Sequence, residues 1–365
     1  MTIRVLVVED SLTVRRRIVE VLSADPEIVV VGEAADGDLG VALCERLRPD
    51  VATFDMVLPG KTGLEATEHI MAYFPTPIVI VSSSTNRGEM LSTYDALAAG
   101  AVDVLDKPDG SADDDGWDSR LVARVKLVSK IKVITHPRAR IRDQTVGRVG
   151  TPPRAFAARS PLAERRLDDV PRPAAIGIGA STGGPGALLE ILRALPSDLP
   201  VPVLVVLHVA PMFASALPDW LDRNTRVRVA EASAGERLKN LAPGTVLVAP
   251  PNKHLAVASG RVALTAAPER HFCRPSVDVL FESMALDLGA SAVGCLLTGM
   301  GRDGAAGLLA MRRAGARTFA QDEATSVVYG MPREAALIGA AERVLPLERI
   351  ADALVAAARG LERVS

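Results

Sequence analysis

Residues 174–186 read A-A-I-G-I-G-A-S-T-G-G-P-G, and this stretch decides the fold of the second half of the chain. An apolar run ends abruptly in small residues that carry one hydroxyl pair, Ser181-Thr182, and a helix-compatible segment (ALLEILRAL) begins at Ala187. A buried strand that breaks into a glycine-rich turn and then opens a helix is where α/β proteins place their ligands. The stretch therefore predicts an α/β domain with a functional site at this turn.

Two interpretations of this turn compete. The segment from Gly179 to Gly183 fits G-x-S-x-G, which presents a nucleophilic serine on a sharp strand-to-helix turn. Its glycines also loosely fit the fingerprint of a dinucleotide phosphate site. A dinucleotide site needs an acidic residue about twenty positions after the glycines to bind the ribose hydroxyl. Residues 201–207 read VPVLVVL and contain no acidic residue. The residues therefore favour a nucleophile, Ser181.

The α/β pattern continues to about Leu361. Apolar runs alternate with helical stretches, which predicts a doubly wound, Rossmann-like sheet, and two runs around Ser259-Gly260 predict a hairpin inserted in it. The predicted strands are Ala175–Gly179, Val203–His208, Val227–Glu231, Thr245–Ala249, Ala292–Leu297, Arg317–Gln321 and Arg343–Leu345. The predicted helices include Gly186–Leu195, Ala214–Asp222, Ser276–Leu288, Gly304–Ala314 and Ile350–Arg359.

Partners for Ser181 follow two other predicted strands. A serine nucleophile needs a base within hydrogen-bond reach and an acid that orients the base. His208 ends the second strand, and Asp303 lies in the glycine-rich turn after the strand at 292–297. Because such a triad is defined by geometry and not by chain order, Ser181, His208 and Asp303 form a candidate triad. The backbone N–H groups around Thr182 and Met300 are candidate oxyanion donors.

The first part of the chain, to about residue 135, predicts a second α/β domain. Five strands alternate with helical stretches, which indicates a parallel, doubly wound sheet. The predicted strands are Arg4–Val8, Ile28–Ala34, Val51–Phe54, Ile78–Val81 and Asp103–Leu105, and the helices include Leu12–Leu22, Leu39–Leu47 and one near Leu121–Ile134. The strand ends carry Glu9, Asp10, Asp55, Ser82 and Lys107.

These strand-end residues predict a cation site. Three carboxylates at one rim repel each other unless a hard cation lies among them, and Mg²⁺ prefers such oxygen ligands. A lysine and a hydroxyl opposite can contact phosphoryl oxygens. The expected ligands are Glu9, Asp10 and Asp55, with Ser82 and Lys107 as phosphoryl contacts.

Residues 136–173 predict a linker between the two domains. From Pro137 to Pro173 the chain has six prolines and nine arginines against four acidic residues. With little apolar periodicity, such a segment cannot bury enough surface to order itself. A basic arm that contacts nucleic acid is the alternative, but the segment has no interleaved aromatic residues beyond Phe156 and no helix-turn-helix pattern nearby.

Composition narrows the function classes. The 365 residues carry a formal net charge of −2, 48% hydrophobic and 24% charged residues, which is typical of globular proteins and favours neither nucleic acid nor anionic membranes as partners. No apolar run is long enough to span a bilayer, and the start of the chain lacks a secretory pattern.

Cys44, Cys273 and Cys295 are scattered, so we expect reduced core residues in a cytoplasmic protein. Cys273 as a nucleophile is discounted, because no sequence feature activates it.

The first domain resembles the receiver domain of bacterial response regulators, which has a flavodoxin-like five-stranded parallel sheet. The resemblance rests on V-L-V-V-E-D, F-D-M-V-L-P-G, V-I-V-S and D-K-P. It implies that Asp55 accepts a phosphoryl group from a histidine kinase, that Mg²⁺ is held by the three carboxylates with the Val57 carbonyl, and that Ser82 and Lys107 sense the phosphoryl group. Val104 replaces the aromatic residue that is frequent three positions before the lysine.

The second domain, residues 174–365, resembles the chemotaxis protein-glutamate methylesterases/protein-glutamine glutaminases. The resemblance rests on G-I-G-A-S-T-G-G-P, L-H-V-A-P, A-P-P-N-K-H-L, R-P-S-V-D-V-L-F-E-S, L-T-G-M-G-R-D-G and Q-D-E-A-T-S-V-V-Y-G-M-P. L-H-V-A-P is one residue longer than the family's usual wording before the proline.

This second resemblance implies a serine hydrolase without a cofactor at its hydrolase site. It would act on glutamyl methyl esters and glutamines of methyl-accepting chemoreceptors, under control of the phosphorylated receiver. Ser181 would be the nucleophile, His208 the proton relay, Asp303 its orienting acid, and the Met300 N–H an oxyanion donor, with Thr182 nearby. We expect a monomer without nucleic-acid or membrane partners. A non-catalytic adaptor and a nucleotide-binding output domain are the alternatives.

Overall fold

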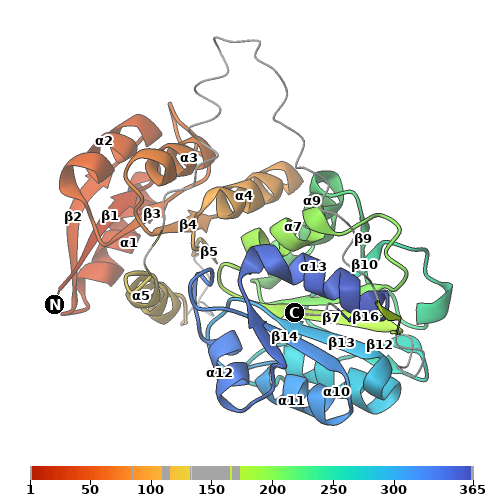
Figure 1. The fold of residues 1–365 in the computed structure, drawn as a ribbon. Coiled ribbons are helices and arrows are strands. Elements are labelled where there is room, and N and C mark those ends of the chain that lie inside the picture. Colours follow the sequence, from red (N-terminus) through yellow and green to blue (C-terminus); the bar gives the residue numbers. More distant parts are fainter. Residues whose placement is uncertain are drawn as a thin grey trace. The chain divides into compact units, whose positions relative to one another are not determined.

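The computed structural model describes residues 2–83, 86–108, 116–131, 133, 165–166 and 173–362, with the side chains of 165–166 and 362 left out. The chain divides into two compact units, Met1–Pro153 and Arg154–Ser365, each with its own sheet (Figure 1). The linker predicted at 136–173 lies almost wholly outside the described residues. In the described part of the chain, no helix is both long and apolar enough to cross a membrane.

The first unit is a parallel sheet of five strands in the order β2-β1-β3-β4-β5. Strand β3 is buried throughout, as expected for a central strand covered by helices on both faces. The strands are β1 (Ile3–Val8), β2 (Ile28–Ala34), β3 (Val51–Phe54), β4 (Ile78–Ser82) and β5 (Asp103–Asp106), and the helices are α1 (Leu12–Ser23), α2 (Gly37–Leu47), α3 (Gly63–Tyr73), α4 (Arg87–Ala99) and α5 (Trp117–Val128). The predicted receiver-like sheet is confirmed.

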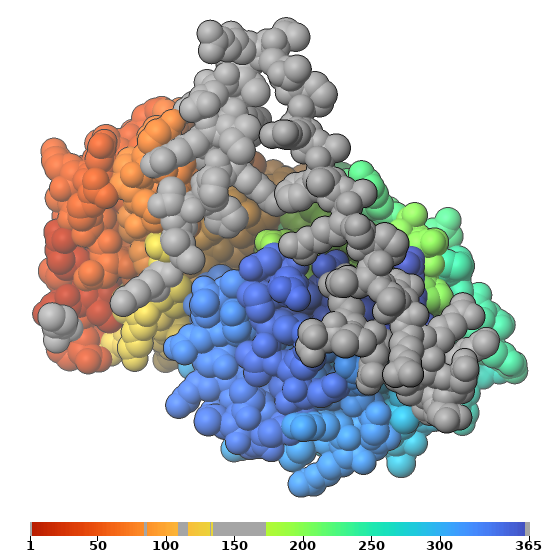
Figure 2. All heavy atoms as spheres, in the orientation of Figure 1, coloured from red at the N-terminus to blue at the C-terminus, as the bar shows by residue number. Residues whose placement is uncertain are grey.

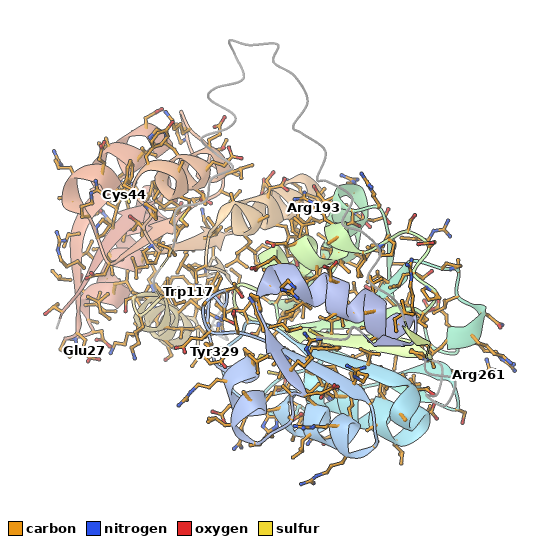
Figure 3. The ribbon with its side chains drawn as sticks, in the orientation of Figure 1. Glu27, Cys44, Trp117, Arg193, Arg261 and Tyr329 are labelled. Carbon is orange, nitrogen blue, oxygen red and sulfur yellow. The ribbon has the colours of Figure 1, made fainter. Side chains whose placement is uncertain are left out.

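The last helix of this unit begins four residues earlier than predicted and ends at Val128. Its first residue, Trp117, is buried and donates its indole N–H to the Asp106 carbonyl at 2.6 Å. This bond fixes the start of α5 against the end of β5 (Figure 3). The apolar pattern alone did not reveal it.

The second unit contains a seven-stranded parallel sheet in the order β15-β14-β13-β7-β8-β10-β9, which confirms the doubly wound prediction. Its strands are β7 (Ala175–Ala180), β8 (Val203–Leu207), β9 (Arg228–Glu231), β10 (Thr245–Val248), β13 (Ala292–Leu296), β14 (Arg317–Gln321) and β15 (Arg343–Leu345). Strand order runs one way from β7 through β8 and the other way from β13 through β15. The boundary between β7 and β13 is therefore the topological switch point, where such folds bind ligands.

Helices cover both faces of this sheet (Figure 1). Helices α7, α9 and α13 lie on one face, and α10, α11 and α12 lie on the other. Figure 2 shows the outer surface of α12 and α13, which form much of the face turned to the viewer. The helices are α7 (Gly184–Ala194), α8 (Pro211–Ala214), α9 (Leu217–Asn224), α10 (Val277–Leu288), α11 (Ala305–Arg313), α12 (Met331–Leu337) and α13 (Leu347–Ala358).

Because Gly179 has no side chain, the start of α10 can pack closely against strand β7. A Cβ added to Gly179 would lie 2.2 Å from the Val277 Cγ1 atom, at the start of α10. A Cβ on Gly183, whose φ is +74°, would lie 2.5 Å from the Val327 Cβ. Both glycines of the G-x-S-x-G segment are therefore needed for close packing around the turn, independently of any phosphate.

Two predictions about this unit are wrong. The hairpin of β11 (His254–Ala258) and β12 (Arg261–Thr265) forms a separate two-stranded sheet packed on α10, because its strands pair with each other and, among the described residues, with no strand of the seven-stranded sheet. The helix expected at 214–222 is split into α8 and α9, since Pro218 fits only the first turn of a helix. Helix α12 begins at Met331, and Tyr329 lies just before it (Figure 3).

A further strand pair lies at the ends of the second unit. β6 (Arg165–Arg166) pairs antiparallel with β16 (Leu361–Glu362). The sequence did not predict it, because two residues are too few to show a periodicity.

Candidate active site

Ser181, His208 and Asp303 follow three neighbouring strands. β7 lies between β13 and β8 in the sheet, so the ends of the strands that precede these residues adjoin one another. The His208 N–H donates to the Ala180 carbonyl at 3.0 Å, and the Ser181 N–H donates to the Thr298 carbonyl at 3.0 Å. These backbone bonds continue the sheet pairing to the site itself.

The His208 imidazole and the Asp303 carboxylate are in contact although 95 residues separate them. His208 Nε2 lies 2.9 Å from Asp303 Oδ2. The Nδ1 atom is therefore the ring nitrogen left for a proton transfer. The structure brings these two predicted residues together, and their catalytic roles stay a prediction.

Asp303 is held by the start of α10. Its carboxylate accepts the Ser276 hydroxyl at 2.7 Å, the Val277 N–H at 2.7 Å and the Asp278 N–H at 3.1 Å. Burial alone would raise the pKa of Asp303, but the bond to His208 and the donors of α10 outweigh it and hold that pKa below its usual range. Free N–H groups at a helix start favour a negative charge. Asp303 is therefore a fixed anion.

His208 is mostly buried, with a side-chain exposure of 14%. Burial alone would lower its pKa, but the hydrogen bond that the ring donates to Asp303 and the neighbouring Cys273 raise the pKa of His208 above its ordinary value of 6.5. The surroundings of the ring therefore stabilise its protonated form. This is the behaviour required of a general base.

Ser181 is half-buried in the turn after β7, and its carbonyl accepts the Gly184 N–H at 2.7 Å. Within the described residues, no hydrogen bond joins its hydroxyl to His208, so the expected contact between nucleophile and base is not formed here. Catalytic hydrogen bonds are often long before substrate binds. Ser181 and His208 are nevertheless on adjoining strand ends.

Cys273 differs from the sequence expectation. Cys44 and Cys295 are buried core residues, as predicted, but Cys273 is partly exposed. Its Sγ lies 3.9 Å from His208 Nδ1. The expectation of a core cysteine is therefore wrong for Cys273, because the tertiary fold places residue 273 beside a histidine 65 positions away.

Sequence reasoning missed a buried network that holds the turns of the site together. The Thr298 hydroxyl donates to the Thr182 carbonyl at 3.0 Å and accepts the Val328 N–H at 2.9 Å. The Gln321 side chain accepts the Thr298 N–H at 2.8 Å and donates to the Thr325 carbonyl at 2.8 Å. Three loops are thereby joined: the Ser181–Thr182 turn, the Gly299–Met300 turn and residues 322–330. The only sequence signal for these contacts was the Q-D-E-A-T-S-V-V-Y-G-M-P segment, which supports the family resemblance but suggested no role for its residues.

The predicted oxyanion donors lie on two of these loops. Thr182 is buried, and Met300 is 57% exposed. The Gly299 carbonyl accepts the Met331 N–H at 2.8 Å, which fixes the turn that carries Met300. Their role as donors stays a prediction.

The first unit gathers its predicted site at the ends of its strands. Carboxylate oxygens of Glu9, Asp10 and Asp55 lie within 4.8 Å of one another. Lys107 Nζ lies 2.8 Å from Asp55 Oδ2 and 2.9 Å from Glu9 Oε2. Ser82 ends β4 and is buried, and its carbonyl accepts the Lys107 N–H at 3.1 Å.

The donor set of this cluster fits Mg²⁺. Burial raises the pKa of Glu9 and of Asp55, and Asp55 raises that of Glu9 further, whereas Lys107 only partly offsets these effects. Glu9 Oε2 is buried and accepts no hydrogen bond among the described residues, although Lys107 Nζ lies 2.9 Å away. Oxygen ligands with excess negative charge are what a hard divalent cation stabilises.

The two units match two known families. The response regulator receiver domain matches residues 5–113, and the CheB methylesterase matches residues 176–354. Fold and site therefore define a class: a response regulator with an esterase-type output domain.

Relatives over nearly the full chain identify the family. The chain belongs to the protein-glutamate methylesterase/protein-glutamine glutaminase family. A protein of that name from Symbiobacterium thermophilum is 44% identical over 359 residues, which cover 97% of each chain. Another from Nitrosospira multiformis is 42% identical over 355 residues, 96% of each chain. The crystal structure of the Thermotoga maritima CheB methylesterase catalytic domain is 35% identical and covers 50% of this chain and 96% of its own, with a TM-score of 0.47.

We expect Thr298→Val to slow the reaction of Ser181 with a serine-directed phosphonate probe by about tenfold to a hundredfold, because a displacement of about 1 Å near a reacting group has effects of this size. Valine keeps the shape but removes the bond to Thr182 and leaves the Val328 N–H without its acceptor. Mass spectrometry of the labelled serine measures the rate.

Thr318→Val is the matched control for this variant. Thr318 is also buried, and its hydroxyl donates to the Ala340 carbonyl at 2.8 Å and accepts the Glu342 N–H at 3.0 Å, away from the site. Thr298→Ser should restore the labelling rate. Equal losses in Thr298→Val and Thr318→Val would mean that the network only stabilises the fold.

Proposed function

We propose that this chain is a response-regulator serine hydrolase that converts glutamyl methyl esters to glutamates, and glutamines to glutamates, on methyl-accepting chemoreceptors. The observation that carries the proposal is the His208–Asp303 pair, joined at 2.9 Å at the strand ends next to Ser181, in a chain of this family. The domains are assigned as receiver at 1–135, linker at 136–173 and catalytic domain at 174–365.

The reaction proceeds in two steps. Ser181 Oγ attacks the side-chain carbonyl while His208 Nδ1 takes the hydroxyl proton, and the N–H groups of Met300 and Thr182 stabilise the oxyanion. Collapse of the intermediate transfers that proton to the leaving methanol or ammonia and leaves an acyl-enzyme. Water then attacks the acyl group, with His208 again as the base, and releases glutamate. Asp303 stabilises the charged imidazole in each step.

The receiver controls this reaction through Asp55. Asp55 accepts the phosphoryl group of a histidine kinase, and Lys107 and Ser82 contact the phosphoryl oxygens. Glu9, Asp10 and Asp55 would hold Mg²⁺, which supplies positive charge for those oxygens. Phosphorylation adds charge at the strand ends and thereby shifts the receiver between two states, one of which favours the open hydrolase site.

The proposal also covers the partners, the oligomeric state and the location of the protein. Its partners are the chemoreceptor substrate and the kinase, and it works as a cytoplasmic monomer that neither inserts into membranes nor binds nucleic acid. The formal net charge of −2 supports this choice of partners.

Ser181→Ala should reduce methanol release from purified methylated receptor by about 10⁴-fold or more, because the nucleophile is removed while binding remains. Gas chromatography measures the methanol. Ser215→Ala, an exposed serine beyond His208, is the control and should keep full activity. Methanol release by Ser181→Ala at the wild-type rate would contradict the triad.

The pH profile tests His208 as the base. A base works when deprotonated, so kcat/KM should rise with pH along a limb that lies above pH 6.5, because Asp303 and Cys273 raise the pKa of His208 above that value. Cys273→Ala removes one of these contributions and should move the limb to lower pH. A limb at or below pH 6.5 in both proteins would contradict this assignment.

Asp55→Asn should abolish Mg²⁺-dependent uptake of a phosphoryl group from a small-molecule phosphodonor, because the acceptor carboxylate is gone. Intact-protein mass spectrometry detects the group. Asp106→Asn changes another carboxylate at the same sheet edge and should still be phosphorylated. In the wild type, the phosphodonor should raise methanol release. An equal rise in Asp55→Asn would show that Asp55 is not the switch.

A further inference from the structure

The environment of Cys273 points to a site that the proposed reaction does not use. One side of the His208 ring contacts Asp303 through Nε2 at 2.9 Å, and the other side faces Cys273, with 3.9 Å between Sγ and Nδ1. One ring nitrogen of His208, the Cys273 sulfur and an Asp303 oxygen all lie within 4.8 Å of one another. Imidazole, thiol and carboxylate are the groups that zinc sites contain.

A tight turn holds the thiol in this place. Arg270 and Cys273 exchange both backbone hydrogen bonds, at 3.1 and 2.9 Å. The two residues between them, His271 and Phe272, have φ angles of 52° and 61°, which is the pattern of a type I′ hairpin turn. The chain direction on either side of this turn is thereby fixed, and Cys273 leaves it toward His208.

We propose that His208 Nδ1 and Cys273 Sγ bind a thiophilic divalent cation of the zinc class, and that this ion inhibits the hydrolase. The ion replaces the thiol proton and, where the imidazole is charged, the Nδ1 proton of His208; these protons are released to solvent, and the ion forms bonds to the thiolate and to the Nδ1 lone pair. Thiolate and imidazole together select zinc-class ions over Mg²⁺. Water molecules complete the coordination.

The distances suit this ion. Zinc–sulfur and zinc–nitrogen bonds are about 2.3 and 2.0 Å, so two such ligands in a tetrahedral site lie about 3.6 Å apart. The observed 3.9 Å between Sγ and Nδ1 is close to this separation.

Asp303 orients the histidine for the ion and does not need to bind it. Its two oxygens already accept four hydrogen bonds, from His208, Ser276, Val277 and Asp278. Metal-binding histidines usually donate their second ring N–H to such a carboxylate, which fixes the tautomer and leaves a lone pair for the metal. The same Asp303–His208 pair that suits proton transfer therefore suits a metal.

The inhibition follows from competition for one lone pair. His208 Nδ1 is the atom that would take the proton of Ser181, so an ion on Nδ1 removes the base. This consequence rests on the proposed function, whereas metal binding itself does not.

The first test measures binding to the full chain. Excess Mg²⁺ occupies the carboxylates of the receiver, and Co²⁺, a coloured substitute for zinc, is then titrated. We expect a near-ultraviolet thiolate-to-cobalt absorption band in the wild type that is lost in Cys273→Ser and in His208→Gln. Cys44→Ala, which removes a buried thiol in the receiver, should keep the band. A band that persists in Cys273→Ser, or its absence from the wild type, would overturn the site.

The second test measures inhibition by Zn²⁺ relative to the metal-free rate of each variant. Loss of a group that only orients a ligand weakens metal binding by about 10–100-fold, so loss of the Cys273 ligand should raise the inhibitory Zn²⁺ concentration by about tenfold or more. A chelator should restore the wild-type rate. Equal inhibition of the wild type and Cys273→Ser would refute the proposal. A metal-free wild type without esterase activity would contradict the proposed function alone, and the cobalt band would still report on the metal site.

Discussion

The candidate active site depends on a carboxylate held by the start of a helix. Asp303 is buried, and a buried charge without hydrogen-bond donors costs several kcal/mol. The Ser276 hydroxyl, just before α10, and the N–H groups of Val277 and Asp278, its first two residues, supply these donors. Because α10 packs on β7 at Gly179, the helix that holds Asp303 also packs against the strand that ends next to Ser181. The positions of Ser181, of Asp303 and of the His208 ring that Asp303 contacts therefore depend on one packing arrangement.

The pKa values of buried carboxylates are shifted in opposite directions at the two sites of this chain. At Asp303, hydrogen bonds outweigh burial and the pKa is lowered, so the charge is already compensated by the protein. At Glu9 and Asp55, burial keeps both pKa values raised despite Lys107, and Asp55 raises the pKa of Glu9 further, so the charge is only partly compensated. The first arrangement suits a group that must keep one ionisation state through a reaction. The second suits a site that takes up a cation and a phosphoryl group and releases them again.

The sequence predicted the features that depend on local pattern and on sheet topology. Strand ends could be read from apolar runs, and parallel strands bring their carboxyl ends to one edge, so the adjoining positions of Ser181, His208 and Asp303 followed from the chain. The Thr298–Thr182 bond joins residues 116 positions apart, and the Cys273–His208 contact joins residues 65 positions apart. Neither contact leaves a periodicity in the sequence, because each depends on how two loops fold above the sheet.

The glycine-rich turn at 179–183 shows why one motif could support two interpretations. A phosphate site needs glycines so that the backbone can approach a ligand. Here the space beside Gly179 and Gly183 is filled by the side chains of Val277 and Val327, from two other parts of the chain. At Gly179 and Gly183, protein side chains therefore occupy the space that a dinucleotide would need. What remains accessible at the turn is the Ser181 side chain, between a strand that ends in His208 and a strand whose following turn carries Asp303. Packing around the two glycines, more than the motif itself, therefore favours the interpretation of this turn as one that presents a nucleophile.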